Sequence, residues 1–301
     1  MNAVENAYAI DLSGKFEMPP RMHINHEGNS LLYMPCFTGK IFGTKILSLF
    51  PANASKDKPV IQGLVLLNDP ETGAPLALLD GAKLTAVRTG AVGGVAVRHI
   101  APENAATVGL IGAGVQGFYQ VLFACCARKI ERVALYDLNR VKCADLAEKL
   151  QEALPGIEIS VSASVEELIE ASEIIITATP AIDPVLPDDQ ELLRGRHYIG
   201  IGSYKPEMRE FPAAVYSLVE KVYIDTEHSL KESGDLITPL YKGWIKPGQI
   251  VKLGEVIGGK IPGSTGGTTL FKSVGMALFD ITLSELIYRS ALKNKIGTLL
   301  D

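Results

Sequence analysis

The chain has 301 residues, which is above the usual size of a single domain and favours two lobes with a crevice between them. With 47% hydrophobic and 21% charged residues, the composition predicts a well-packed α/β protein and argues against disorder. The net charge is −5 and no stripe of lysines and arginines is present, so we expect no nucleic-acid binding.

The four cysteines predict neither a zinc site nor a disulfide framework, because none of them forms a Cys-x-x-Cys pair. They are Cys36, Cys125, Cys126 and Cys143, and free thiols fit a reducing cytosol. The amino-terminal stretch lacks the apolar block of a signal peptide, and no apolar run is long enough to span a bilayer. We therefore expect a cytoplasmic protein that does not enter membranes.

The first part of the chain predicts a mostly antiparallel sheet followed by a helix. Short apolar runs that read as strands lie at 30–37, 41–50, 60–67 and 75–80, with a turn at 68–73 before the last of them. Asp80 can cap the next segment, 81–100, where apolar residues recur at helical spacing.

From residue 105 the pattern changes to buried strands that alternate with helices. The strands are expected at 106–112, 132–137, 157–162, 173–179, 197–202 and 221–225. Such alternation predicts a Rossmann-type doubly wound parallel sheet. We expect a long amphipathic helix over 268–293 to return to the first lobe. The fold class is therefore α/β with a second, discontinuous α+β lobe: 1–101 and 268–301 form that lobe, and 102–267 form the Rossmann domain.

A glycine-rich turn lies between a buried strand and a helix, and we call residues 112–117 the glycine turn. Gly112 allows the tight turn, Gly114 lets the backbone approach a pyrophosphate, and Gly117 lets the helix pack on the strand. Val115 and Gln116 complete the turn at the helix N-terminus, which favours negative charge. This context predicts a dinucleotide site. The alternative is a purely structural turn.

The expected cofactor is NAD(H), because Asp137 ends the next strand twenty residues after Gly117. A carboxylate there accepts hydrogen bonds from ribose hydroxyls and repels a 2′-phosphate. Arg140 is close enough in sequence to pair with such a phosphate, which leaves NADP(H) open. The alternative role for Asp137 is that of a helix cap.

Beyond the glycines, the string at 79–91, LDGAKLTAVRTGA, resembles the signature of the ornithine cyclodeaminase/mu-crystallin family. Further strings agree in family order: Met34-Pro35, Lys45-Ile46, Asn68-Asp69 with Thr72-Gly73, Gly254-Glu255-Val256 and 271–277. The resemblance implies a homodimer whose discontinuous lobe binds substrate and forms the subunit interface. Members usually carry another strand and helix turn before the equivalent of Asn2, which leaves a truncated start open.

The resemblance also implies small amino or imino acids as substrates. It carries over Arg21, Lys45 and Arg88 as the residues that hold the substrate carboxylate, and two nearby arginines would lower the pKa of Lys45 and make it a proton donor. On residue grounds alone, Arg21 and Lys45 read as ordinary surface charges. Arg88 differs, because it lies among small and apolar residues in a helix, where a charge needs a partner.

Four more residues match positions at which the family contacts the cofactor or the edge of the active site: Thr89, Gln116, Thr179 and Ser273. Helix back-bonding or capping is the alternative for these side chains. Ornithine cyclodeaminases carry an aspartate where Tyr204 aligns, and a phenol with a pKa of about 10 is a poor base. Asp225 or Glu207 could replace that base.

Histidines suggest no metal site, since His23 and His26 lack a third ligand and read as loop residues.

Three functions follow from the resemblance. The favoured one is an NAD(P)H-dependent reductase of a cyclic imino acid such as Δ1-pyrroline-2-carboxylate. The others are an ornithine cyclodeaminase or alanine dehydrogenase-like enzyme, and a non-catalytic dinucleotide- or hormone-binding protein, against which the three retained cations argue.

Overall fold

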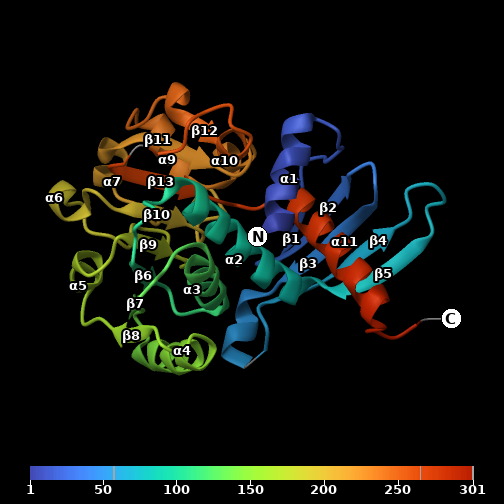
Figure 1. Ribbon diagram of the computed structural model, residues 1–301, viewed down its shortest axis with the longest axis horizontal. Coiled ribbons are helices and arrows are strands. Elements are labelled where there is room, and N and C mark those ends of the chain that lie inside the picture. Colours follow the sequence, from blue (N-terminus) through green and yellow to red (C-terminus); the bar gives the residue numbers. More distant parts are fainter. Residues whose placement is uncertain (57, 265, 300–301) are drawn as a thin grey trace. The chain divides into compact units, whose positions relative to one another are not determined.

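The computed structural model describes residues 1–56, 58–264 and 266–299, and its contacts divide the chain into two compact units (Figure 1). One unit combines Asn2–Arg88 with Met276–Asp301, and the other combines Met1 with Thr89–Gly275. These boundaries differ from the expected ones at 101/102 and 267/268. The observed boundary at 88/89 falls inside a continuous helix, α2 (Gly81–Ile100). The observed boundary at 275/276 follows a strand of the parallel sheet.

The first unit contains an antiparallel sheet with the strands in chain order. Its described strands are β1 (Met22–His26), β2 (Asn29–Phe37), β3 (Phe42–Leu49), β4 (Ile61–Asn68) and β5 (Pro75–Asp80). The four strands predicted for this region are confirmed. The capping role of Asp80 is also confirmed, because its Oδ1 accepts hydrogen bonds from the N–H groups of Ala82 and Lys83.

Strand β1 corrects the expectation that His23 and His26 lie in a loop. All five of its residues are exposed, so no burial pattern marks it as a strand. It forms by pairing along β2, from Met22 opposite Tyr33 to His26 opposite Asn29. Glu27 and Gly28 both have positive φ, 48° and 78°, as a two-residue hairpin turn that follows the strand twist requires.

One face of this sheet is covered by helix α11 (Ala277–Asn294), which contacts β2, β3, β4 and helix α1 (Asn2–Ser13) (Figure 1). Alternation along β3 decides which side chains face that helix, since Gly43, Lys45 and Leu47 are buried while their neighbours are partly exposed. A Cβ on Gly43 would lie 3.0 Å from Cδ1 of Ile281. Lys45 therefore points to the helix-covered side.

The second unit contains a parallel sheet in the order β12-β11-β13-β10-β9-β6-β7-β8. In chain order its strands are β6 (Thr107–Ile111), β7 (Arg132–Tyr136), β8 (Glu158–Val161), β9 (Ile174–Thr177), β10 (His197–Gly200), β11 (Val219–Ile224), β12 (Ile250–Lys252) and β13 (Thr268–Lys272). The helices of this unit beyond α2 are α3 (Val115–Ala127), α4 (Arg140–Ala153), α5 (Val165–Glu170), α6 (Gln190–Leu193), α7 (Ala213–Leu218), α8 (Ser229–Glu232), α9 (Gly234–Tyr241) and α10 (Leu253–Ile257). Short 3-10 helices occur at Pro51–Lys56 and Pro247–Gln249. The predicted doubly wound α/β fold with a separate sheet lobe is confirmed.

The predicted helix over 268–293 is wrong in its first part. Residues Thr268–Lys272 are strand β13, which is fully buried and pairs in parallel with β10 on one side and β11 on the other. A short buried strand carries no alternation, so its apolar run reads like the start of the helix that follows it. The helix itself begins at Ala277, after the cap residue Met276.

Within the described residues, no helix combines the length and the apolar character needed to cross a membrane.

Candidate functional site

The glycine turn joins β6 to α3, and its three glycines differ in what surrounds them. Gly112 has φ 107°, and a Cβ there would lie 2.6 Å from the carbonyl oxygen of Ala178. At Gly117 an added Cβ would lie 2.5 Å from the carbonyl oxygen of Gly112. Gly114 has open space where a Cβ would stand. Two glycines thus allow close packing, whereas Gly114 leaves the turn open to a ligand.

Two further features of the glycine turn fit an anionic ligand. Gly114 is the N-cap of α3 and provides no side-chain cap for the first N–H groups of that helix. The side-chain Oε1 of Gln116 is buried and has no hydrogen-bond partner within the part of the chain that the structure describes. A buried acceptor without a donor is costly, and the hydroxyl groups of a dinucleotide could supply one.

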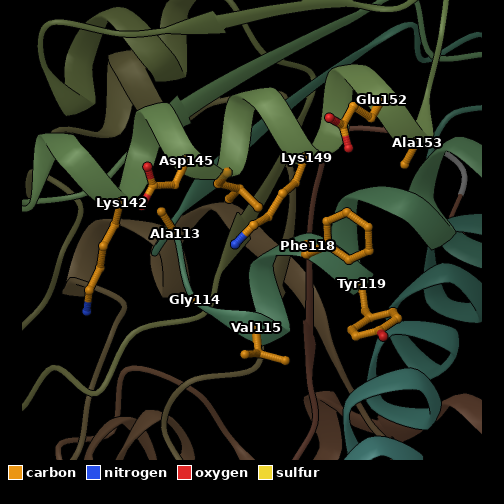
Figure 2. Close-up of a pocket in the computed structure, with 11 residues that line it drawn as sticks. Ala113, Gly114, Val115, Phe118, Tyr119, Lys142, Asp145, Lys149, Glu152 and Ala153 are labelled. Atoms are coloured by element: carbon orange, nitrogen blue, oxygen red, sulfur yellow. The ribbon is translucent and has the colours of Figure 1, made fainter. Parts of the chain in front are cut away.

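A pocket of about 740 Å³ opens beside the glycine turn, between α3 and α4. Figure 2 shows Lys149 and Phe118 extending from the two helices toward this space. The residues that line it are Ala113, Gly114, Val115, Phe118, Tyr119, Lys142, Asp145, Leu146, Lys149, Glu152 and Ala153. The exposed backbone of the turn therefore borders a hollow large enough for part of a dinucleotide.

Asp137 follows β7 and holds the glycine turn directly. Its Oδ2 accepts a hydrogen bond from the Ala113 N–H at 2.8 Å, and its Oδ1 accepts one from the Asn139 N–H at 2.8 Å. The cap of α4 is Asn139, whose side-chain oxygen accepts from Val141 and Lys142. The helix-cap alternative for Asp137 is therefore wrong. A carboxylate has about four acceptor positions, so two hydrogen bonds leave capacity for ribose hydroxyls.

Arg140 is already engaged by backbone. Its Nη1 and Nη2 donate to the carbonyl oxygens of Ser162 and Ala163, both at 2.5 Å. The guanidinium also lies 5.1 Å from the centre of the Tyr136 ring. A 2′-phosphate would have to compete with these contacts for the side chain.

Beyond the carboxyl ends of β9 and β10, Glu210 joins two loops that sequence reasoning did not connect. Its Oε1 accepts from the N–H and the Oγ1 of Thr179, each at 2.8 Å. Its Oε2 accepts from the N–H groups of Gly202 at 2.7 Å and Ser203 at 3.2 Å. Burial raises the pKa of Glu210, and the charge of Lys272 opposes that rise.

Asp235 and Lys272 form a buried ion pair behind Glu210. Oδ1 of Asp235 accepts from the Glu210 N–H at 2.7 Å, and its Oδ2 lies 3.4 Å from Nζ of Lys272. Both side chains are fully buried. The sequence signals that could have found this group were an acid next to Phe211-Pro212 and the lysine inside the family string at 271–277.

Ser273 is held by Asp225, whose Oδ2 accepts from Ser273 Oγ at 2.7 Å. The same oxygen also accepts from the N–H groups of Val274 at 3.0 Å and Gly275 at 2.6 Å. Asp225 is buried, and its Oδ1 accepts from the Thr226 N–H. Its carboxylate thus fixes the start of the segment that leads to α11. Thr89 is likewise buried, and its carbonyl accepts from Gln120 Nε2 at 2.9 Å.

In the antiparallel-sheet unit, Lys45, Arg88 and Asp280 form a group that we call the cation cluster. Nζ of Lys45 donates to Oδ2 of Asp280 at 2.6 Å, and Nε of Arg88 donates to Oδ1 at 3.1 Å. Lys45 and Asp280 are completely buried, and the Arg88 side chain is 7% exposed. The view of Lys45 as a surface charge is therefore wrong. Arg88 has the partner that its surroundings require, and Asp280 was not foreseen.

The electrostatics of the cation cluster make Lys45 titratable near neutrality. Burial, which disfavours the charged form, is the main cause that lowers the pKa of Lys45 from 10.5 to about 7. The charge of Asp280 raises it, whereas the charges of Arg88 and Arg21 lower it. The predicted direction is thus confirmed, but desolvation contributes more than the two arginines.

Tyr204 is exposed in the loop after β10, with the Lys205 ammonium 5.8 Å from the centre of its ring. Partial burial and the charge of Glu207 raise the pKa of the phenol. Tyr204 is therefore neutral near pH 7.

The exposed histidines of β1 take no part in a metal cluster: among the described residues, no group of three His, Cys, Asp or Glu side chains is arranged to hold a metal.

Comparison with known proteins places this geometry in a family. The model of the ornithine cyclodeaminase/mu-crystallin family matches residues 1–295. The chain belongs to this family.

Three relatives are similar over nearly their full lengths. A Δ1-pyrroline-2-carboxylate reductase of Bacillus cereus is 37% identical over 284 residues, which cover 92% of this chain and 86% of the relative. The structure of the Thermococcus litoralis Δ1-pyrroline-2-carboxylate reductase, in complex with NADH and L-proline, superimposes with a TM-score of 0.94 at 36% identity and covers 99% of this chain and 94% of that one. An archaeal alanine dehydrogenase dimer with bound NAD gives a TM-score of 0.91 at 30% identity, with 100% and 93% of the chains covered.

Proposed function

We propose that this protein is an NAD(H)-dependent reductase that converts Δ1-pyrroline-2-carboxylate or a related cyclic ketimine to the amino acid. The observation that carries the proposal is the cation cluster, in which a buried lysine with a pKa of about 7 lies beside an arginine. The similar proteins named as pyrroline-2-carboxylate reductases, one of them with bound NADH and L-proline, support the substrate and the cofactor.

The dinucleotide would be held by the glycine turn, Asp137 and Gln116, and when bound it supplies a hydride for the imine carbon. Arg88 uses Nε for Asp280, and a guanidinium has four further N–H donors with which to hold a substrate carboxylate. Together with Arg21, it would fix the orientation of the substrate. Lys45 would then donate its proton to the imine nitrogen as the C–H bond forms, and water would return a proton to the neutral amine of Lys45.

For the cofactor we propose NAD(H) in preference to NADP(H). Asp137 is fixed by two backbone N–H groups, and its charge would repel a 2′-phosphate. Arg140, the cation best placed in sequence to attract that phosphate, donates to two carbonyl oxygens. The neighbouring structures with NADH or NAD agree with this preference.

A homodimer is our proposal for the assembly, supported by the dimer of the similar alanine dehydrogenase. On the face of the antiparallel sheet opposite Lys45, apolar side chains follow one another across paired strands. Three of them are more than half exposed: Met22 at 59%, Leu64 at 53% and Leu78 at 56%. Several exposed apolar side chains on one face of a sheet favour burial of that face against a second copy.

The dimer proposal predicts that Leu64→Glu yields monomers, because the new carboxylate would be buried unpaired in the interface. Light scattering coupled to size-exclusion chromatography measures the mass. Leu292→Glu, at an exposed site near the end of α11, is the control and should keep the parent mass. A Leu64→Glu protein with unchanged mass would contradict this interface.

We also propose a cytoplasmic location, supported by the free thiols of all four cysteines, which suit a reducing compartment.

The activity is tested by supplying pyrroline-2-carboxylate with NADH, and in parallel with NADPH, and following the absorbance of the reduced cofactor and the formation of proline. Separate reactions contain ornithine with NAD, and pyruvate and ammonia with NADH. Rapid oxidation of NADH by the cyclic imine is the expected result. Conversion of ornithine to proline and ammonia, or reduction of pyruvate alone, would overturn the proposal.

A further inference from the structure

Asp280 connects the two buried cations of the cation cluster, and each of its oxygens serves one of them. Oδ2 lies 2.6 Å from Nζ of Lys45, and Oδ1 lies 3.1 Å from Nε of Arg88. The three side chains come from β3, α2 and the first turn of α11. The carboxylate therefore sets the spacing between Lys45 and Arg88, and its hydrogen bonds to both cations fix its orientation.

Three charged side chains face Lys45, one from the loop ahead of β1, one from α2 and one from α11. Arg21, ahead of β1, and Arg88, on α2, both disfavour its ammonium form, and Asp280 is the neighbour that favours it. Cys36 on β2 faces the same carboxylate, but burial and Asp280 raise the pKa of its thiol to about 12, so it stays neutral. The charge state of Lys45 thus depends on the balance between Asp280 and two guanidinium groups.

An entirely structural role is the alternative for Asp280. Buried ion pairs contribute little net stability, and similar packing can be reached with apolar side chains. Such a role would make the loss of Asp280 equally harmful at every pH. A role that acts through the proton of Lys45 would instead make the harm depend on pH.

We propose that Asp280 is a positioning residue that holds Lys45 beside Arg88 and keeps Lys45 protonated until the imine nitrogen takes its proton. This inference rests on the proposed reductase function. In the step, an N–H bond of the Lys45 ammonium breaks and an N–H bond forms on the imine nitrogen, while the imine carbon receives the hydride that NADH loses. Lys45 is left as a neutral amine, and Asp280 keeps its negative charge throughout.

The test compares pH profiles of kcat/KM for the parent and for Asp280→Asn between pH 5 and pH 9, with pyrroline-2-carboxylate and NADH. In the parent, activity should fall as the pH rises through about 7, because the protonated form of Lys45 acts. Removing an adjacent opposite charge lowers such a pKa by about one to three units. A shift of one unit would cost the variant roughly 10-fold at pH 8 and almost nothing at pH 5, and a larger shift would cost more at both pH values, but always much more at pH 8 than at pH 5.

Two further variants separate charge from shape. Asp280→Glu keeps the charge, so its falling limb should stay at the pH of the parent even if kcat decreases. Glu173→Gln is the matched control, since Glu173 accepts hydrogen bonds from Ala106 and Thr107 at the amino ends of the parallel strands. It should lower thermal stability without moving the limb.

If Asp280→Asn does not fold, Asp280→Ser leaves room for water and repeats the measurement. An equal loss at every pH, or the same shift in Asp280→Glu as in the amide variant, would overturn the positioning role. A parent protein that does not reduce the cyclic imine would instead refute the proposed function.

Discussion

The buried imidazole of His197 leads to a quantitative prediction of how the stability of the protein depends on pH. It begins β10, between β9 and β13, and its Nδ1 is hydrogen-bonded to Thr269 Oγ1. Its Nε2 is buried without a hydrogen-bond partner in the described part of the chain. Burial, assisted by the charge of Arg128, lowers the pKa of His197 from 6.5 to about 3. The folded protein therefore keeps this imidazole neutral at pH values where an unfolded chain protonates it.

The sign follows from that difference in proton binding. Between pH 6.5 and pH 3 the unfolded state binds one more proton, so the stability that neutral His197 contributes is present above pH 6.5 and is lost as the pH falls. At 1.36 kcal/mol per pH unit, the loss is about 2 kcal/mol at pH 5 and about 3 kcal/mol at pH 4. That is a substantial part of a typical unfolding free energy of about 5–15 kcal/mol.

The assay is urea unfolding at pH 7, 6 and 5, followed by the fluorescence of Trp244. This is the one tryptophan of the chain, and it packs in the same compact unit as His197. His197→Gln should lose less stability than the parent between pH 7 and pH 5, by about 2 kcal/mol. Thr269→Val removes the hydrogen-bond partner but keeps the imidazole, so it should retain most of the parent's pH dependence. Equal slopes in the parent and His197→Gln would refute this reasoning.

Two predictions concern binding. Asp137→Ala should weaken the binding of NADH by roughly 10-fold or more in Kd and weaken the binding of NADPH less, because it removes a charged acceptor as well as a charge that repels phosphate. Fluorescence titrations with both cofactors measure the ratio of the two Kd changes. A larger loss of affinity for NADPH would remove Asp137 from this role. Arg88→Lys should lower kcat/KM nearly as much as Arg88→Ala, by roughly 30- to 150-fold. The reason is that one ammonium cannot both reach Asp280 and hold a substrate carboxylate through two hydrogen bonds. Steady-state kinetics of Arg88→Lys near the parent values would rule out Arg88 as the carboxylate-binding residue.

Local patterns predicted the strand, turn and helix that we propose as the dinucleotide site. The strand, the glycine turn and the helix are adjacent in sequence, and each glycine has a backbone reason that can be read from that context. The position of Asp137 followed from the same unit. Its hydrogen bond to Ala113 was not predictable from the pattern, because it depends on how the end of β7 meets the turn.

Long-range pairs account for most of what was missed. Asp280 lies 235 residues from Lys45 and 192 from Arg88, and in the sequence it is an ordinary acid in the first turn of a helix. Strand β13 was assigned to that helix because a fully buried strand has no alternation. Strand β1 was missed for the opposite reason, since it is exposed throughout and is defined by pairing alone.

The carboxylates beyond the carboxyl ends of the parallel strands bear on the choice between reductase and cyclodeaminase. Ring closure of ornithine needs a base for the substrate amines. We expect Tyr204 at the position of that base, and its phenol is neutral near pH 7. Asp225, the first replacement considered, has Oδ2 occupied by Ser273 and two backbone N–H groups. Glu210 likewise uses both oxygens to hold the loops after β9 and β10.

A carboxylate whose acceptor positions, about four in number, are all filled must give up a hydrogen bond in order to take a proton. For Asp225 and Glu210 that exchange would release the loops they hold, because each accepts several backbone N–H groups that would lose a buried acceptor. Glu207 lies in the same exposed loop as Tyr204. Among the described residues, it is the carboxylate nearest to Tyr204 in sequence that does not hold backbone N–H groups in this way. Reduction of a preformed imine avoids this requirement, since it needs a held carboxylate, a hydride and one proton, and Lys45 can deliver that proton near pH 7. The arrangement of acids and bases in this chain therefore favours imine reduction over cyclodeamination.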